Sequence, residues 1–439
     1  MKFQYIIVSF FGIMAVIGLT VFSVFPNKPK NDSLAGAAGN VAIWGTYQKN
    51  DGLTRMLQLF NTEYKGSFSI SYSYHDPKTF DNDIIEALAS GRGPDVLLLP
   101  DDLILRYADK IEQIPYSMIP QLAFQSTFVQ AAEIYMRDTG LVAVPYAIDP
   151  IVMYWNRDIF NNASITLPPK YWDELLVLAP KLTIRDQKTR DITQSAIAFG
   201  EYANVNNAKD ILTMLFLQTG DPIVKFENGK PVLTFTRTDG VNVTPNADDV
   251  SALRFYMDFS NPLKNIYSWS RALPNSSDQF LNGRLAVYFD YVSSYNILKE
   301  KNPHLNFAVT QIPKTRNATV DISAAKIHGL AVMKSSRNKA TAFIAIQKLL
   351  EAKYSGAFSE AFSLPPVRRD LLSVRPADAV LSVSYDAAIR SRAWLDPRPA
   401  ISDQLYREII EGISSGKMSF SDAITYLNSG LSTALDSYK

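Results

Sequence analysis

Nine aromatic and acidic residues follow the strand-like runs of this sequence, and their side chains suit the recognition of a sugar. In an open α/β sheet, ligands bind outside the carboxyl ends of the strands, so residues after strands are the first candidates for a site. A sugar offers apolar C–H faces, which pack on aromatic rings, and hydroxyls, which hydrogen-bond to carboxylates. The candidate ligand-binding residues are Trp44, Tyr47, Asp101, Asp102, Tyr146, Asp149, Trp155, Asp290 and Tyr291.

The acidic candidates also have simple structural alternatives. Asp101 and Asp102 could cap a helix that begins directly after them, and Asp290 could cap the following segment VSSYNILKE, since Asp is a preferred N-cap residue. Asp149 precedes a proline and could shape a turn instead of meeting a ligand. For each of these carboxylates, the structural and the binding role both stay open.

The tryptophans are open in the same way. Trp44 could pack against the segment before the first strand rather than on a ligand. Trp269 and Trp394 are candidates for exposed loops or for an interface.

Other chemistries find little support in the sequence. The chain has no cysteine, which excludes disulfides, thiolate nucleophiles and Cys-ligated metal centres. The spacing of its three histidines, His75, His304 and His328, is not that of a metal site. A phosphate-binding loop precedes a helix, whereas the glycine pair at 91 and 93 precedes a strand. Lys plus Arg and Asp plus Glu nearly balance at 44 and 43, so nucleic acid is not an expected partner. We therefore expect no metal and no cofactor.

The elements that position the candidates alternate between strand and helix. Helices are predicted for 53–64 and 80–91, and the intervening strands for 41–44, 67–75 and 94–100. The run PDVLLLP has no polar alternation, as expected for a strand covered on both faces. This alternation predicts a parallel α/β sheet.

The second half of the chain contains a further set of strands and ends in helices. Strands are predicted for RLAVYFD (284–290), NFAVTQIP and GLAVM, and the region after Met333 is predominantly helical, with a helical C-terminal stretch over 402–437. Because this is too much chain for one sheet, two α/β lobes are predicted.

The N-terminus carries the strongest membrane signal. Residues 3–26 are uncharged, and the length of this run is close to the roughly 20 residues needed to span a bilayer. The first small-residue cleavage motif, SLAGAAG, lies well beyond this run, which favours a retained anchor over a cleaved signal peptide. Residues 1–26 are thus expected to form a membrane anchor or signal segment, and 27–40 a solvated linker.

Five segments, in order, resemble the extracellular solute-binding proteins of ABC importers, in particular the family 1 group that includes the maltose- and oligosaccharide-binding proteins. They are IIEALASGRGPDVLLLPDD, PYAIDPIVMYWNRDIF, FLNGRLAVYFDYVSSY, GLAVMKSSRNKATAFIAIQKLL and LPPVRRDLL. In relatives, the aromatic residue matched by Trp155 stacks on the sugar. Where many relatives have Gly and Trp after the strand AVYF, this chain has Asp290, Tyr291 and Val292, so a known binding mode does not carry over in detail.

The resemblance implies a two-lobed, type II periplasmic-binding-protein-like α/β fold with several interlobe crossovers, preceded by one N-terminal transmembrane helix. Lobe 1 would comprise 41–148 and 322–360, and lobe 2 would comprise 149–321 and 361–439. Crossovers near Asp149 and Asp321 would form the hinge.

The resemblance also implies a function, that of a non-catalytic, monomeric binding subunit. It would capture a small solute, with a sugar favoured, and deliver it to an ABC permease from the outer side of a bacterial membrane, or as a secreted or periplasmic protein if the N-terminal segment is cleaved. Two alternatives remain. One is a ligand-sensing domain of the same fold, and the other is a tethered glycoside hydrolase using Asp149 and Asp290, whose carboxylates would have to lie about 5–10 Å apart.

Overall fold

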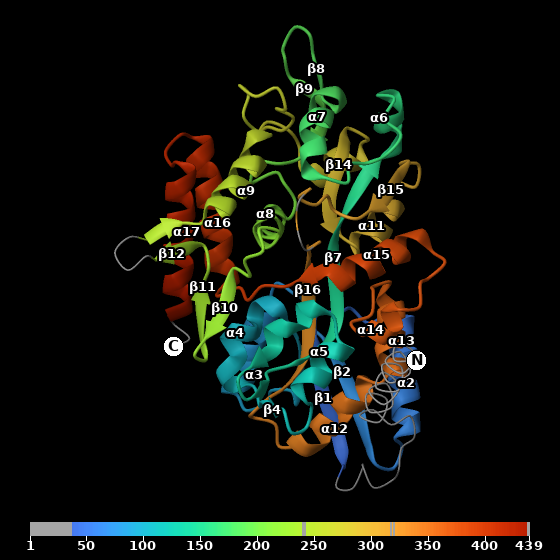
Figure 1. Cartoon of the computed structure of the whole chain (residues 1–439). Coiled ribbons are helices and arrows are strands. Elements are labelled where there is room, and N and C mark those ends of the chain that lie inside the picture. The colour runs from blue at the N-terminus through green and yellow to red at the C-terminus, as the bar shows by residue number, and fades with distance from the viewer. Residues whose placement is uncertain (1–36, 239–242, 317, 319–320, 437–439) are drawn as a thin grey trace, which may run out of the picture.

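The computed structural model describes residues 37–238, 243–316, 318 and 321–436, which form a two-lobed α/β protein (Figure 1). The predicted membrane segment, and most of the predicted linker, lie outside these residues. Among the helices of the described part of the chain, none combines the length and the apolar character needed to cross a membrane.

The elements up to the first passage between the lobes alternate as the sequence predicts. The strands are β1 (Gly39–Gly45), β2 (Phe68–Tyr74), β3 (Val96–Pro100), β4 (Ile114–Pro115), β5 (Met136–Arg137), β6 (Gly140–Leu141) and β7 (Val144–Asn156). The helices, with η marking 3-10 helices, are α2 (Asp51–Glu63), α3 (Phe80–Ala89), η2 (Asp101–Leu103), α4 (Ile104–Tyr107), η3 (Ala108–Lys110), α5 (Gln121–Thr127) and η4 (Gln130–Tyr135).

The rest of the chain adds shorter strands and most of the helices. The strands are β8 (Ile184–Arg185), β9 (Ile192–Ile197), β10 (Val224–Glu227), β11 (Lys230–Leu233), β12 (Thr236–Thr238), β13 (Val243–Pro245), β14 (Leu285–Tyr291), β15 (Phe307–Thr310), β16 (Ser323–Val332) and β17 (Ser391–Arg392). The helices are α6 (Arg157–Asn162), α7 (Trp172–Leu182), α8 (Ala208–Leu217), α9 (Ala247–Asp258), α10 (Ser276–Leu281), α11 (Ser294–Lys301), α12 (Lys339–Leu349), α13 (Ala352–Phe362), α14 (Arg369–Leu372), α15 (Ala379–Arg390), α16 (Pro399–Ser414) and α17 (Phe420–Asp436).

The first lobe is built on the parallel strands β2, β1 and β3. Ile43 of β1 lies opposite Tyr72 of β2 and Val96 of β3. The side chains of β3 are buried on both faces up to Leu99, which explains the apolar run without polar alternation. Against this sheet packs α2, whose buried residues Leu53, Met56 and Phe60 recur at helical spacing.

One long strand, β7, runs from the first lobe into the second (Figure 1). Its first half pairs antiparallel with β16, with Ile148 opposite Ile327, and its second half pairs antiparallel with β14 and β15. The resulting strand order is β2-β1-β3-β16-β7-β14-β9-β8. The two lobes therefore share one continuous sheet.

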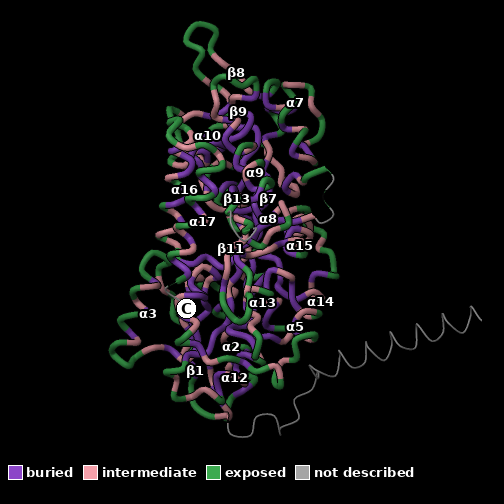
Figure 2. Tube along the Cα trace, turned by 60° about the vertical axis from the view of Figure 1, so that its left-hand side comes forward, coloured by how far each residue is buried: buried purple, intermediate pink, exposed green. Residues whose placement is uncertain are grey.

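The second lobe surrounds the far half of that sheet with helices. The C-terminal helices α16 and α17 pack on each other and on α9, in agreement with the helical C-terminal region that the sequence predicts. Figure 2 shows buried segments running through both halves of the molecule, with exposed segments at the tips. Trp269 is fully buried, so its expected place in an exposed loop is wrong.

One carboxylate is buried in the second lobe, at the first turn of α9. Asp249 is only 1% exposed, and one of its oxygens accepts a hydrogen bond from the Thr219 hydroxyl at 3.1 Å. Its other oxygen, Oδ2, is buried and has no hydrogen-bond partner among the described residues. Burial, with Asp221 and Asp248 nearby, raises the pKa of Asp249 to about 7.

Candidate functional site

Two adjoining cavities lie where β3, β16 and α8 meet. The larger has a volume of about 740 Å³ and the smaller of about 330 Å³. Asp101, Asp102 and Lys326 line both, so these three residues mark the junction between the cavities. The walls combine residues of the first lobe, such as Asp101, with residues of the second, such as Asn207.

Asp101 and Asp102 reach the junction because β3 ends immediately before them. They form the start of η2, whose N-cap residue is Pro100, so neither aspartate is the N-cap that the sequence allowed. Asp101 is 7% exposed and accepts a long hydrogen bond of 3.4 Å from the backbone N–H of Ile327. Burial raises the pKa of both carboxyls above the usual range, to about 6 for Asp102, where repulsion from Asp396 adds to the effect.

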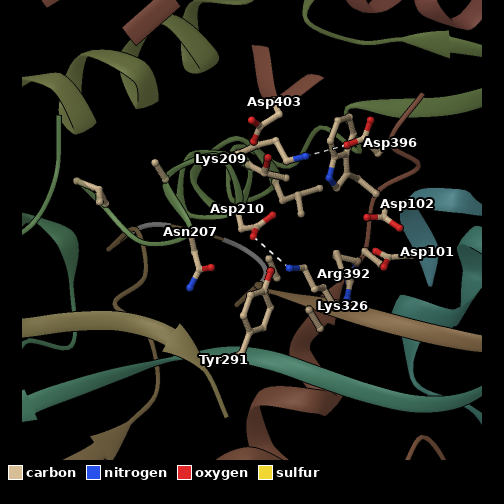
Figure 3. Close-up of a pocket in the computed structure, with 18 of the residues that line it drawn as sticks. Asp101, Asp102, Asn207, Lys209, Asp210, Tyr291, Lys326, Arg392, Asp396 and Asp403 are labelled. Carbon is tan, nitrogen blue, oxygen red and sulfur yellow. Dashed lines mark hydrogen bonds and ion pairs between the residues drawn. The ribbon is translucent and has the colours of Figure 1, made fainter. Parts of the chain in front are cut away.

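The N-terminus of α8 supplies a lysine and an aspartate that face opposite walls of the smaller cavity. Asn207 precedes the helix in the left-handed conformation, at φ 57°. The Lys209 ammonium lies 3.1 Å from Asp396, and the Asp210 carboxylate lies 3.5 Å from the Lys326 ammonium (Figure 3). In each ion pair an ammonium group, which donates hydrogen bonds, lies beside a carboxylate, which accepts them, on the wall of the cavity.

Lys326 is the central cation of the site. It projects from β16 at the junction and lies 4.5 Å from the ring centre of Tyr291. Burial disfavours its charge, but Asp210, Asp101 and Asp102 outweigh that effect and raise the pKa of the ammonium above its ordinary value. Lys326 is therefore protonated at neutral pH.

Five of the nine candidate residues line the cavities. Tyr47 and Asp149 line the larger one, Tyr291 lines the smaller one, and Asp101 and Asp102 line both. Asp149 accepts a hydrogen bond of 3.1 Å from the Ser293 N–H, ahead of α11, and burial raises its pKa to about 6.

The other four candidates line neither cavity. Trp44 stacks on His75 with ring centres 4.1 Å apart, and Trp155 packs edge-on against Phe160 at 5.1 Å. Tyr146 is buried in the core of the first lobe.

Asp290, the last of these four, is hydrogen-bonded within the protein. It accepts from the Asn207 amide at 2.7 Å and from the Tyr288 hydroxyl at 2.6 Å. It does not cap the following helix, since α11 begins after Ser293 and has no side-chain cap. Asp290 instead fixes Asn207, which does line the smaller cavity.

Several cavity residues were missed by the sequence reasoning. Trp394 is 8% exposed and lines the smaller cavity, so the exposed-loop expectation for it is wrong. Lys326 carried a usable signal, because a lysine interrupts the otherwise apolar strand SAAKIHGLAV. The remaining missed residues with charged or amide side chains on the smaller cavity are Asn207, Lys209, Asp210, Arg392, Asp396 and Asp403.

This two-lobed arrangement, with cavities where the lobes meet, defines the solute-binding class of α/β proteins. Comparison with known proteins specifies the family. Residues 48–354 match the model for bacterial extracellular solute-binding proteins, and the chain belongs to that family. The structural neighbours include proteins that bind maltodextrins and other sugars.

Individual relatives are distant. A putative binding protein of Brucella abortus (strain 2308) is 23% identical over 251 residues, which cover 56% of this chain and 55% of that protein, so the match spans about half the length of the Brucella protein. The galactooligosaccharide-binding protein of Bacillus subtilis (strain 168) is 20% identical over 404 residues, covering 90% of this chain and 88% of that protein.

Solved structures show the shared fold. The cyclic α-maltosyl-1,6-maltose-binding protein of Arthrobacter globiformis has a TM-score of 0.74 at 16% identity, covering 92% of this chain and 100% of that chain. The sugar-binding protein MalE of Xanthomonas citri has a TM-score of 0.71 at 18% identity, covering 91% of this chain and 98% of that chain.

Proposed function

We propose that this chain is the non-catalytic solute-binding subunit of an ABC importer and captures a sugar or oligosaccharide in the two adjoining cavities. The observation that carries the proposal is the pairing of acceptors with donors on the cavity walls, Asp396 with Lys209 and Asp210 with Lys326. A sugar hydroxyl both donates and accepts, so it can bridge such a pair and satisfy both partners.

Aromatic surface beside these pairs supports a sugar as the ligand. Trp394 and Tyr291 line the smaller cavity, and Tyr47 lines the larger one. Flat rings remove the apolar C–H face of a sugar from water while its hydroxyls reach the polar groups. In this proposal Tyr47, Asp101, Asp102, Asp149 and Tyr291 contact the ligand, together with Trp394 and Lys326.

The lobes would close on the ligand by rotation about the strands they share. Closure would take place where β7 passes Asp149 and where the chain returns near Asp321, since a few residues at element ends can absorb such a rotation. We propose the lobe division expected from the sequence, with one change. Residues 361–372 contact the first lobe through the Phe362–Tyr47 ring pair at 4.8 Å and the hydrogen bond of 2.7 Å from Arg369 to the Phe128 carbonyl, so lobe 1 would extend to about residue 372.

The location and the partners follow from the family and from the apolar run at residues 3–26. The binding lobes would lie outside a bacterial cell membrane, held there by a retained N-terminal helix. The protein would act as a monomer and deliver the ligand to a permease.

Isothermal titration calorimetry of the full chain in mild detergent tests the function, with a panel of mono- and oligosaccharides. We expect saturable binding of at least one sugar, and the Lys326→Met variant should weaken it, since it removes the donor of one pair. The Arg375→Met variant changes the charge of an exposed ion pair with Asp386 and should not affect binding. No binding across the panel by a folded chain would refute the proposal.

A further inference from the structure

The junction between the cavities holds more negative charge than its own cations balance. Asp101 and Asp102 line it, Asp149 lines the larger cavity beside it, and none of the three makes an ion pair within 4 Å among the described residues. Of the other cations on the walls, two are paired with carboxylates, Lys209 with Asp396 at 3.1 Å and Arg106 with Asp81 at 2.9 Å. Arg392 donates to the Ser391 carbonyl and Arg398 is exposed, and in the described part of the chain neither forms an ion pair with Asp101, Asp102 or Asp149.

Lys326 cannot neutralise this group of carboxylates alone. It lies opposite Asp149 across the β16–β7 strand pair and near Asp101 and Asp102, but its ammonium is paired with Asp210. Asp101, Asp102, Asp149 and Asp210 thus lie around one lysine. Across both cavities, seven carboxylates face five cations among the described lining residues.

Closing the lobes over a neutral ligand would strip water from these unpaired carboxylates. Burying a carboxylate without a counter-charge is unfavourable, so a neutral ligand leaves a cost that a cationic ligand removes. An ammonium group has three N–H donors and no acceptor, so it supplies to these carboxyl groups both the positive charge and the donors that a neutral ligand lacks.

A bare metal ion does not fit the same groups. No three Asp, Glu or His side chains in the described ranges converge closely enough to hold a metal ion. The carboxylates come from two separate elements, β7 and η2, so an organic cation carried on a larger molecule fits better.

We propose that the ligand is an amino sugar, whose protonated amine docks among Asp101, Asp102 and Asp149 beside Lys326 while its hydroxyls meet the ion pairs of the smaller cavity. This inference rests on the proposed sugar-binding function and narrows it to a class of sugar. It makes these three carboxylates the residues that select the ligand.

The test compares each neutral sugar with its amino counterpart by calorimetry at pH 7.5 on the full chain in mild detergent. Glucose, galactose, mannose and the β-1,4 glucose disaccharide are each paired with their 2-amino-2-deoxy forms, and spermidine serves as a cation without a sugar. We expect the amino form of the preferred sugar to bind roughly 10- to 100-fold more tightly than the neutral form, the range for a hydrogen bond between charged groups.

Variants assign the preference to the junction. Asp102→Asn should reduce the ratio of the two affinities, because it removes one of the three carboxylates and leaves a side chain of the same shape. Asp173 lies on α7 and forms an exposed ion pair with Arg316. Asp173→Asn should therefore leave the ratio of the two affinities unchanged.

Each outcome separates this inference from the general function. Equal or tighter binding of the neutral sugar would overturn the amino-sugar inference and leave the sugar-binding function standing. Binding of spermidine without any sugar, or no binding at all, would overturn both.

Discussion

Replacing Asp249 by Asn should stabilise the protein at neutral and alkaline pH. The carboxylate is 1% exposed, one of its oxygens is unpaired, and burial, with Asp221 and Asp248 nearby, raises its pKa from 3.8 to about 7 despite the Thr219 hydrogen bond. One pKa unit corresponds to about 1.4 kcal/mol, so a shift of about three units amounts to at most about 4 kcal/mol. Because the folded-state pKa is the higher one, the protonated carboxyl stabilises the fold, fully below about pH 4, and this stability is lost as the pH rises through about 7.

Urea unfolding followed by tryptophan fluorescence at pH 5, 6, 7 and 8 measures this effect. The free energy of unfolding of Asp249→Asn relative to the natural protein should rise by about 2–3 kcal/mol from pH 5 to pH 8. Asp248→Asn, at the exposed neighbouring position in the same turn, serves as the comparison. Because Asp248 is only one contributor to the raised pKa of Asp249, this variant should show the same trend at a much smaller size. If Asp249→Asn and Asp248→Asn follow parallel pH curves, the buried charge is not the cause and the reasoning fails.

Three further predictions concern the binding lobes and the N-terminus. Trp394→Ala should weaken sugar binding by roughly 5- to 150-fold, which corresponds to the free energy of burying one sugar face. Trp155→Ala should change the affinity little. If calorimetry gives the reverse order, Trp155 and not Trp394 stacks on the sugar. Small-angle scattering should show a smaller radius of gyration at saturating ligand, and an identical profile would contradict hinge closure. Mass spectrometry of the native membrane fraction should detect peptides from residues before Pro26, and a mature N-terminus near Gly36 would contradict retention of the anchor.

The order of elements was accessible from the sequence because local patterns dictate it. The apolar run of β3 and the helical spacing of Leu53, Met56 and Phe60 each specify an element without reference to the rest of the chain. The sharing of one sheet by both lobes was not accessible, since the pairing of β7 with β16 joins residues far apart in the sequence.

The site was predictable where its residues directly follow a strand, as Asp101 and Asp102 follow β3. Trp44 and Trp155 also lie at strand ends, yet each packs on a neighbouring ring, because strand direction does not specify which way a side chain turns. Lys209 and Asp396 come from a helix start and a loop, and only the tertiary structure brings them together.

The pairing of β3 with β16 sets the order in which the chain can fold during synthesis. Val96 lies opposite Val332, more than 200 residues later, so the first lobe stays open on one side until nearly three quarters of the chain has been made. Contacts this distant in sequence form slowly. A chain that must cross a membrane before it folds gains from this delay, because the part synthesised first cannot complete its lobe until β16 has been made.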